Sequence, residues 1–278
     1  MKNTFVTAGV MGWPVAHSRS PVIHNHWIQQ YKCRGTYGLF PVKPENLEAA
    51  IRGLSALGCA GCNITIPHKV EAMQFMDWVD PLAQRMGAIN TIVVQADGSL
   101  HGFNHDGYGY IQSLKDAQPE WRADAGPVVV LGAGGAARAI VVSLIDQGVT
   151  EIRILNRTRA KADALASEFG ATVIPLDWSQ RHTALAGAAL LVNTTNQGMH
   201  NEPALDLELN DLPTHALVSD AIYIPLETPL LASARKRGNT TVNGLGMLLN
   251  QARPAFHAWF GVMPEITHEL NELITSTL

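Results

Sequence analysis

One segment of the chain has the residue types and spacing to bind a phosphate group: Gly132-Ala133-Gly134-Gly135-Ala136-Ala137. The run Val128–Leu131 before it is typical of a buried strand, Arg138–Gln147 after it of a helix, and Glu151–Leu155 of a second strand. Strand, G-x-G-x-x-A turn, helix and strand within about 30 residues are the context of a dinucleotide-binding fold. We therefore expect Gly132, Ala133, Gly134, Gly135 and Ala136 to approach a pyrophosphate at the helix N-terminus. A glycine-rich turn without a ligand is the alternative.

The end of the second predicted strand indicates which dinucleotide is bound. NAD enzymes carry Asp or Glu about 20 residues after the turn, where it binds the ribose 2′-hydroxyl. This chain has Asn156-Arg157-Thr158-Arg159-Ala160-Lys161 there. Because cationic side chains form charge-assisted hydrogen bonds with phosphate, we expect NADP, with its 2′-phosphate held by Asn156, Arg157, Thr158 and Lys161. The alternative is a helix capped by Thr158 with solvated basic side chains.

Two later predicted strands also end in polar residues. Ala189–Val192 is followed by Asn193-Thr194-Thr195-Asn196, and Ala216–Ser219 ends at Asp220. Ligand-binding residues of such sheets lie at the strand ends, so these segments are further candidates for the same site.

The elements of the N-terminal half predict a second α/β region. Strand-like and helix-like segments alternate there; in chain order they are Phe5–Val10, Ser20–Tyr31, Tyr37–Val42, Pro44–Leu57, Asn63–Ile66 and Ile89–Val94. Ser20 has the side-chain acceptor of an N-cap, and Pro21 and Pro44 suit the first positions of helices. At the other end of the chain, Gly246–Phe260 and Pro264–Ile274 have the apolar spacing of helices.

Composition and charge exclude several classes of protein. With 278 residues the chain is long enough for two modest domains, and its 16% of charged residues is not typical of disorder. The longest apolar stretch, Val128–Ile145, contains Arg138 and three glycines, so we expect no membrane span. The N-terminus does not read as a secretory signal, which indicates the cytoplasm. The net charge of −4 and the scattered basic residues argue against nucleic acid as a partner.

The cysteines and histidines do not form a recognisable metal or redox motif. Three cysteines are an odd number that suits reduced thiols. Cys59 and Cys62 form a CxxC pair, but Asn63–Ile66 reads as a strand, whereas a redox pair opens a helix that lowers a thiol pKa. We expect buried spectator thiols, with redox or zinc chemistry as the alternatives, and no metal.

Several motifs together resemble the shikimate dehydrogenase family along the whole chain. Their order and spacing are far more specific than the glycine-rich turn alone. They are His17-Ser18-Arg19-Ser20-Pro21, Asn63-Ile64-Thr65-Ile66-Pro67-His68-Lys69, Gly87-Ala88-Ile89-Asn90-Thr91, Gly102-Phe103-Asn104-His105-Asp106-Gly107, Gly132-Ala133-Gly134-Gly135-Ala136, Asn156-Arg157-Thr158, Asp220-Ala221-Ile222-Tyr223 and Gly244-Leu245-Gly246-Met247-Leu248, with Gln251 beyond.

The resemblance implies a fold and a reaction. Residues 1–108 are expected to form a substrate-binding domain, residues 109–245 an NADP-binding Rossmann domain, and residues 246–278 helices that pack back on the N-terminal domain, with a cleft between the two domains. The reaction implied is the reversible reduction of 3-dehydroshikimate to shikimate by NADPH. The expected partner is a small-molecule substrate, and the chain is expected to be a monomer or a homodimer.

The resemblance also assigns roles to single residues. Lys69 matches the general acid of the reduction, and Asp106 the residue that orients it and binds a substrate hydroxyl. Lys69 follows the apolar run Ile64–Pro67 at a predicted strand-to-helix junction, a place suited to desolvation; by itself it reads as a solvated lysine. The other matched substrate residues are Ser18, Ser20, Asn63, Thr65, Asn90, His105, Tyr223 and Gln251. The matched cofactor residues add Thr194, Thr195, Ala221 and Gly244 to those above.

One departure from the family pattern bears on the substrate. The family usually has Thr immediately before the catalytic Asp, and this chain has His105. A histidine in the pocket changes its volume and its proton balance, which points to quinate or an aminoshikimate-type substrate, whereas a ring turned outward leaves shikimate. The Ser18-Arg19-Ser20 pattern resembles shikimate-selective members, since quinate-using members commonly have Thr at the second position. A non-catalytic protein that binds NADP or a shikimate-like ligand is the alternative from a different class.

Overall fold

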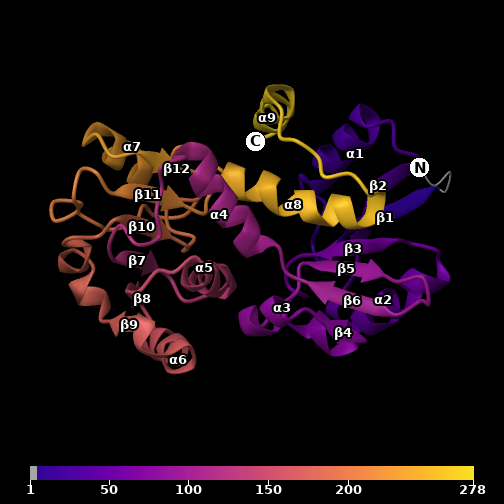
Figure 1. The fold of residues 1–278 in the computed structure, drawn as a ribbon, viewed down its shortest axis with the longest axis horizontal. Coiled ribbons are helices and arrows are strands. Elements are labelled where there is room, and N and C mark those ends of the chain that lie inside the picture. Colours follow the sequence, from indigo (N-terminus) through magenta and orange to yellow (C-terminus); the bar gives the residue numbers. More distant parts are fainter. Residues whose placement is uncertain (1–4) are drawn as a thin grey trace. The chain divides into compact units, whose positions relative to one another are not determined.

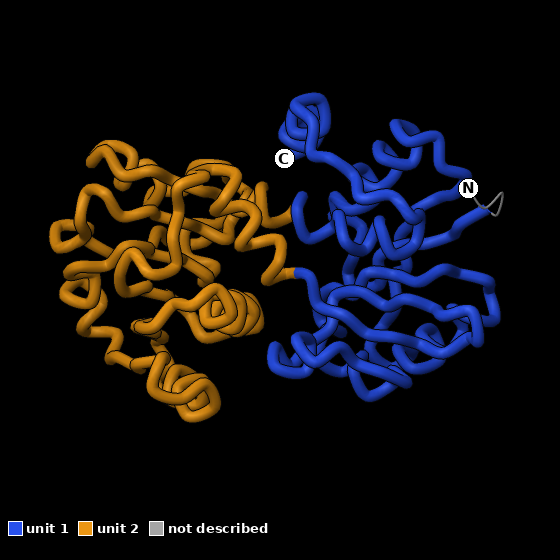
Figure 2. Tube along the Cα trace, viewed as in Figure 1, with its two compact units in different colours: residues 1–105, 249–278 blue, residues 106–248 orange. Residues whose placement is uncertain are grey.

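The computed structural model describes residues 5–278, which divide into two compact units. Figure 2 shows the first unit, with residues 5–105 and 249–278, in blue and the second, residues 106–248, in orange. The predicted boundaries after residues 108 and 245 each lie three residues from these. Both units are α/β structures, as the sequence predicts.

The first unit is built on a mixed six-stranded sheet in the order β2-β1-β3-β5-β6-β4 (Figure 1). β1 pairs parallel with β2 and β3, while β3–β5 and β5–β6 are antiparallel. The elements are β1 (Val6–Gly12), α1 (Ser20–Gln30), β2 (Gly35–Pro41), η1 (Pro44–Asn46), α2 (Leu47–Ala56), β3 (Gly61–Ile64), η2 (Glu71–Phe75), β4 (Trp78–Val79), α3 (Pro81–Met86), β5 (Thr91–Val94) and β6 (Leu100–Phe103). The apolar face of α2, with Leu47, Ile51 and Leu54, packs in one cluster with Ile64 and Ile92 of the sheet.

Two local predictions in this unit are wrong. Ser20 is not the N-cap of α1 but its first helical residue, and the cap, Arg19, makes no side-chain capping bond. Instead Ser18 Oγ accepts a 3.3 Å hydrogen bond from the backbone N–H of Ser20. The strand predicted over Asn63–Ile66 ends at Ile64, because the backbone of Thr65 and His68 closes a turn with a 3.0 Å hydrogen bond.

The C-terminal helices complete the core of the first unit. α8 (Gly244–Phe260) begins in the second unit and continues into the first, and α9 (His268–Thr275) lies in the first. In the first unit, Trp259 Nε1 donates to the carbonyl of Ile92 at 3.2 Å, and Trp27 Nε1 to that of Glu265 at 3.1 Å. Leu270 and Ile274 of α9 are buried. The first unit therefore needs both the N-terminal and the C-terminal part of the chain.

The second unit is a parallel six-stranded sheet in the order β12-β11-β10-β7-β8-β9. Every neighbouring pair is parallel, and the order reverses between β7 and β10, as in the doubly wound dinucleotide-binding fold. The elements are α4 (Asp106–Ala117), β7 (Val128–Leu131), α5 (Gly135–Asp146), β8 (Ile152–Leu155), α6 (Arg159–Phe169), η3 (Gly170–Thr172), β9 (Val173–Leu176), η4 (Trp178–Gln180), η5 (Thr183–Leu185), β10 (Leu190–Asn193), β11 (Leu217–Asp220), α7 (Pro229–Lys236) and β12 (Thr241–Val242).

The central strands of this sheet are apolar because helices cover both of their faces. All four residues of β7 are fully or almost fully buried: Val128 and Val130 pack in one apolar cluster, and Val129 and Leu131 in another. Across residues 5–278, no helix is both long and apolar enough to cross a membrane.

Candidate cofactor and substrate sites

The turn after β7 leaves no room for a side chain at its first glycine. Gly132 has φ +103°, and a Cβ built there lies 2.4 Å from Oγ1 of Thr194. Thr194 in turn donates to the carbonyl of Leu131 at 2.7 Å. Two predicted cofactor residues, one after β7 and one after β10, therefore touch at the point where the strand order reverses.

The N-terminus of α5 suits a pyrophosphate. Its N-cap, Gly134, offers no side chain to the first N–H groups of this 12-residue helix. A Cβ at Gly134 or Gly135 meets nothing within 4 Å, and both residues and Ala136 are exposed. Backbone donors and the positive end of the helix dipole thus face open space, the arrangement that binds anions in dinucleotide folds.

The basic side chains after β8 differ in what they bind within the protein. Arg159 is occupied, since it lies 2.7 Å from Asp163 and 3.1 Å from Asp177. Arg157 and Lys161 are exposed and make no salt bridge within the described part of the chain. Two cations thus remain for a 2′-phosphate, so the residues present fit NADP.

Asn156 and Thr158, the polar residues of this segment, form a turn before α6 and do not cap the helix through their side chains. Thr158 occupies the N-cap position of α6 without a capping side-chain bond, and Asn156 Nδ2 donates to its carbonyl at 2.8 Å. Thr158 is exposed, as is the adjacent Arg157.

A buried carboxylate organises the ends of β10 and β11. Asp220 is 1% exposed and accepts hydrogen bonds from Asn193 Nδ2 at 3.1 Å, Ile222 N at 3.1 Å and Thr228 Oγ1 at 2.7 Å. Asn193 Oδ1 accepts from the N and Oγ1 of Thr195 at 3.0 and 2.8 Å. Burial raises the pKa of Asp220, although these hydrogen bonds oppose the shift. Asp220 therefore holds the loop that carries Thr195.

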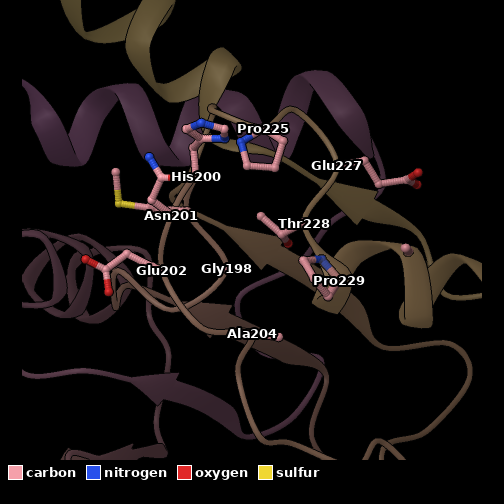
Figure 3. Close-up of a pocket in the computed structure, with 11 residues that line it drawn as sticks. Gly198, His200, Asn201, Glu202, Ala204, Pro225, Glu227, Thr228 and Pro229 are labelled. Atoms are coloured by element: carbon pink, nitrogen blue, oxygen red, sulfur yellow. The ribbon is translucent and has the colours of Figure 1, made fainter.

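A hollow of about 610 Å³ opens between the loops that follow β10 and β11 (Figure 3). None of the predicted site residues lines it, so it is not the predicted site. Its lining residues are Gly198, Met199, His200, Asn201, Glu202, Ala204, Pro225, Glu227, Thr228, Pro229 and Ala232.

A hydrogen-bond network joins the predicted substrate residues of the first unit. Asn63, buried at β3, donates from Nδ2 to the carbonyl of Asn90 at 3.0 Å and to Thr91 Oγ1 at 3.1 Å. Its Oδ1 accepts a 2.6 Å hydrogen bond from the hydroxyl of Tyr37 in β2. Thr91 Oγ1 donates to Asn90 Oδ1 at 2.9 Å. The amide of Asn63 is thus held at both ends.

His105 and Gln251 extend the same network. The N–H of His105 donates to Asn90 Oδ1 at 3.0 Å, and its Nδ1 lies 3.1 Å from Thr91 Oγ1. Its ring stacks on Phe103 with centroids 6.0 Å apart. Asn90 Nδ2 donates to Gln251 Oε1 at 3.3 Å. The backbone N–H of His105 therefore binds a predicted substrate residue, while its ring contacts Thr91 and Phe103.

Ser18 and Ser20 lie at the start of α1. Ser18 Oγ accepts from the N–H of Ser20, and Ser20 is buried. Arg19, between them, donates from Nη2 to the carbonyl of Thr277 near the C-terminus. The cation of this loop is thus anchored to the C-terminal segment.

Lys69 lies in the turn between β3 and η2 and is half-buried. Its carbonyl accepts from Ile89 N at 2.9 Å, so the turn is tied to the segment that leads into β5. The preceding residue, His68, is fully buried, and its Nε2 lies 2.7 Å from the carbonyl of Val42. His68 therefore fixes the backbone next to Lys69.

Most of the predicted catalytic and substrate-binding residues lie in the first unit. Asp106, the first residue of α4, and Tyr223, after β11, belong to the second unit, and both are half-buried. The residues in the first unit are Ser18, Ser20, Asn63, Thr65, Lys69, Asn90, His105 and Gln251.

Three residues of these networks have structural roles that the sequence does not indicate. Tyr37 reads only as the first residue of a strand-like run, Thr91 as the end of a motif, and Asp220 as a strand end. No local signal distinguishes these roles, because the partners are distant in sequence.

The cysteines lie in the first unit without a redox signature. All three are free, and Cys59 and Cys62 are buried. Burial raises the pKa of both thiols, the opposite of what a reactive thiolate needs. Within residues 5–278, no three His, Cys, Asp or Glu side chains gather as a metal site.

Comparison with known proteins gives consistent matches. A family model described as "Shikimate dehydrogenase substrate binding domain" matches residues 10–92, and one described as "Shikimate / quinate 5-dehydrogenase" matches residues 116–206. The shikimate dehydrogenase (NADP(+)) of Paramagnetospirillum magneticum is 51% identical over 269 residues, which are 97% of this chain and 98% of that protein.

Solved structures agree over nearly the whole length. The shikimate 5-dehydrogenase of Thermus thermophilus in complex with NADP(H) and shikimate superposes with a TM-score of 0.86 at 36% identity, covering 98% of this chain and 100% of that one. The quinate dehydrogenase of Corynebacterium glutamicum in complex with NAD has a TM-score of 0.90 at 27% identity, covering 98% and 100%.

Proposed function

Because the chain belongs to the shikimate dehydrogenase family, we propose that it reversibly reduces 3-dehydroshikimate to shikimate with NADPH. It is an NADP-dependent oxidoreductase, as the motifs predict. The observation that carries the cofactor assignment in this chain is the pair of exposed cations, Arg157 and Lys161, where an NAD enzyme has a carboxylate.

We assign the proton transfer to Lys69 and the support of that residue to Asp106. NADPH, when bound, supplies the hydride. The ketone oxygen that gains negative charge then needs a proton, which Lys69 gives as an ammonium group in the reduction and accepts as a neutral amine in the oxidation. Asp106 orients the ammonium group and binds a substrate hydroxyl. The turn fixed by His68 and Ile89 supports this role, since it limits where Lys69 can reach.

We assign substrate recognition to the polar residues of the first unit and to Tyr223. Ser18 and Ser20 are proposed to bind the substrate carboxylate. The residues proposed to hold the ring hydroxyls or the carboxylate are Asn63, Thr65, Asn90, Tyr223 and Gln251, with His105 beside them. Hydrogen-bonding residues discriminate strongly, because an analogue that lacks a hydroxyl leaves a buried partner unpaired.

The experiment that tests this function is the initial rate of NADP reduction with shikimate, followed by NADPH absorbance, for wild type and Lys69→Ala. We expect turnover in wild type and a kcat about 10²- to 10⁴-fold lower in Lys69→Ala, since general acid–base catalysis contributes that much. Lys115→Ala is the matched control, because Lys115 is exposed and its Nζ donates only to Gln147 among the contacts described. Full turnover in Lys69→Ala refutes the assignment.

A second candidate function is a quinate or aminoshikimate-type dehydrogenase. The contact of His105 with Thr91 favours it, because a bulky titratable ring lies where the family usually has Thr. Comparing kcat/KM for shikimate and quinate in wild type distinguishes the two functions. Stabilisation of the protein by NADP or shikimate without any change in NADPH absorbance supports the third possibility, a non-catalytic binding protein.

Location and assembly complete the proposal. We propose that the protein works in the cytoplasm as a monomer or homodimer on a small-molecule substrate. Sedimentation at micromolar concentration, with and without NADP, distinguishes the two assembly states.

A further inference from the structure

Tyr37 contacts a residue that we propose binds substrate. Its hydroxyl donates to Asn63 Oδ1 at 2.6 Å. Tyr37 lies in β2 and Asn63 in β3, and both side chains are buried, Tyr37 being 2% exposed. The bond therefore joins two strands at a buried point.

The hydrogen bonds of Asn63 determine how its amide can bind a substrate hydroxyl. An amide side chain has two N–H donors and one oxygen with two lone pairs. The two donors of Asn63 go to the Asn90 carbonyl and to Thr91 Oγ1, and one lone pair takes the phenol hydrogen of Tyr37. A substrate hydroxyl that binds Asn63 without breaking a contact must therefore donate to the remaining lone pair. Tyr37 thus fixes the amide in the acceptor orientation.

The ring of Tyr37 has no freedom to move away from Asn63. It stacks on His24 with centroids 4.1 Å apart and planes 2° from parallel, and its centroid lies 6.0 Å from that of Trp259. His24 is fully buried against Trp27 and Phe256, and burial lowers its pKa to about 3, so it remains neutral. The stack holds the phenol oxygen in place.

We propose that Tyr37 is a positioning residue for substrate binding, which holds Asn63 as a hydrogen-bond acceptor. The inference rests on the proposed function. It predicts that Asn63 selects a substrate with a donating ring hydroxyl.

A double-mutant cycle tests the proposal with purified full-length protein, shikimate and NADP. Tyr37→Phe keeps the ring stack and removes the hydroxyl, so KM for shikimate should rise about 3- to 10-fold, the effect of one hydrogen bond. KM for NADP should stay within about twofold. In an Asn63→Ala background, Tyr37→Phe should have no further effect on KM for shikimate, because its target is gone.

Tyr31→Phe is the matched control. Its hydroxyl accepts a hydrogen bond from Glu265 N at 2.9 Å, and its ring contacts Phe256, but none of its described contacts is with a proposed substrate residue. It should leave KM for shikimate unchanged. An unchanged KM in Tyr37→Phe, or an effect of equal size with and without Asn63, overturns the proposal.

A second measurement needs no change at Tyr37 and so holds even if Tyr37→Phe does not fold. Shikimate analogues in which fluorine replaces one ring hydroxyl can accept a hydrogen bond but cannot donate one. For wild type, one of these analogues should have an inhibition constant about 3- to 10-fold above the Kd for shikimate, and the difference should vanish in Asn63→Ala. Differences that do not depend on Asn63 overturn the proposal. Absence of shikimate turnover in wild type refutes the proposed function instead, and with it this inference.

Discussion

The hydrogen bonds of Thr91 determine which group donates in its contact with His105. Thr91 Oγ1 has one hydrogen, which goes to Asn90 Oδ1, an acceptor at 2.9 Å. The same oxygen accepts from Asn63 Nδ2. In the contact of Thr91 Oγ1 with His105 Nδ1 at 3.1 Å, the imidazole N–H therefore donates. A threonine in place of His105 has no ring nitrogen to make this bond.

The substitution His105→Thr tests whether this residue selects the substrate. We expect kcat/KM for shikimate to fall about 3- to 10-fold, because Thr91 loses one donor. KM for NADP should not change. Initial rates with shikimate and with quinate are the measurement. A reversal of the order of the two substrates would show that His105 sets the specificity and would favour the quinate or aminoshikimate alternative.

At the scale of elements, the basic side chains at the start of α6 differ in whether they pair with carboxylates of the protein. Arg159 pairs with two carboxylates of the protein, whereas Arg157 and Lys161 are exposed. Arg157→Ala should raise KM for NADPH about 10- to 100-fold, the value of a hydrogen bond to a charged group, and leave KM for NADH unchanged. Arg159→Ala is the matched control and should change both values by less than about threefold. Equal losses in the two variants would contradict the assignment of the 2′-phosphate.

The ends of β10 and β11 predict a pH dependence of stability. Burial raises the pKa of Asp220 above its usual 3.8, so the folded state binds its proton more tightly than the unfolded state. The stability that this carboxyl contributes is present below pH 3.8 and is lost as the pH rises through the raised pKa. Asp220→Asn removes this loss. The free energy of unfolding of wild type minus that of Asp220→Asn, from urea titrations, should therefore fall as the pH rises from about 4. A constant difference would contradict the argument.

At the scale of the whole molecule, the two units differ in how the chain builds them. The second unit is continuous, and its two apolar clusters lie wholly within residues 106–248. The first unit is discontinuous, because Trp27 and His24 pack on Phe256 and the carbonyl of Ile92 is bound by Trp259. The N-terminal segment therefore lacks part of its own core.

Separate fragments test this difference. Residues 106–248 should unfold cooperatively on heating and bind NADP, which tryptophan fluorescence can follow. Residues 1–105 should show no cooperative transition, since the partners of Trp27 and His24 are absent, and adding residues 249–278 as a peptide should restore one. Cooperative unfolding of residues 1–105 alone would show that the C-terminal helices are dispensable for that core.

The sequence alone determined the parts whose signal is local. The apolar run Val128–Leu131 and the glycines after it predict the dinucleotide fold, because a buried parallel strand and a turn without side chains require those residue types. The cations after Leu155 indicate NADP because they can pair with a 2′-phosphate. The ordered motifs predict the family. In the N-terminal half, however, neither the antiparallel strand β6 nor the end of β3 at Ile64 follows from hydrophobic periodicity.

The tertiary structure alone decided which side chains act together. Tyr37, Asn63 and Thr91 come from three different strands, and no residue near any of them in sequence announces the others. The carboxyl of Asp220 accepts from donors both before and after it in the chain. Arg159 gains its second carboxylate, Asp177, because β9 and the following loop bring that residue to it. Hydrogen bonds and burial depend on distance in space, which the chain sets only after it has folded.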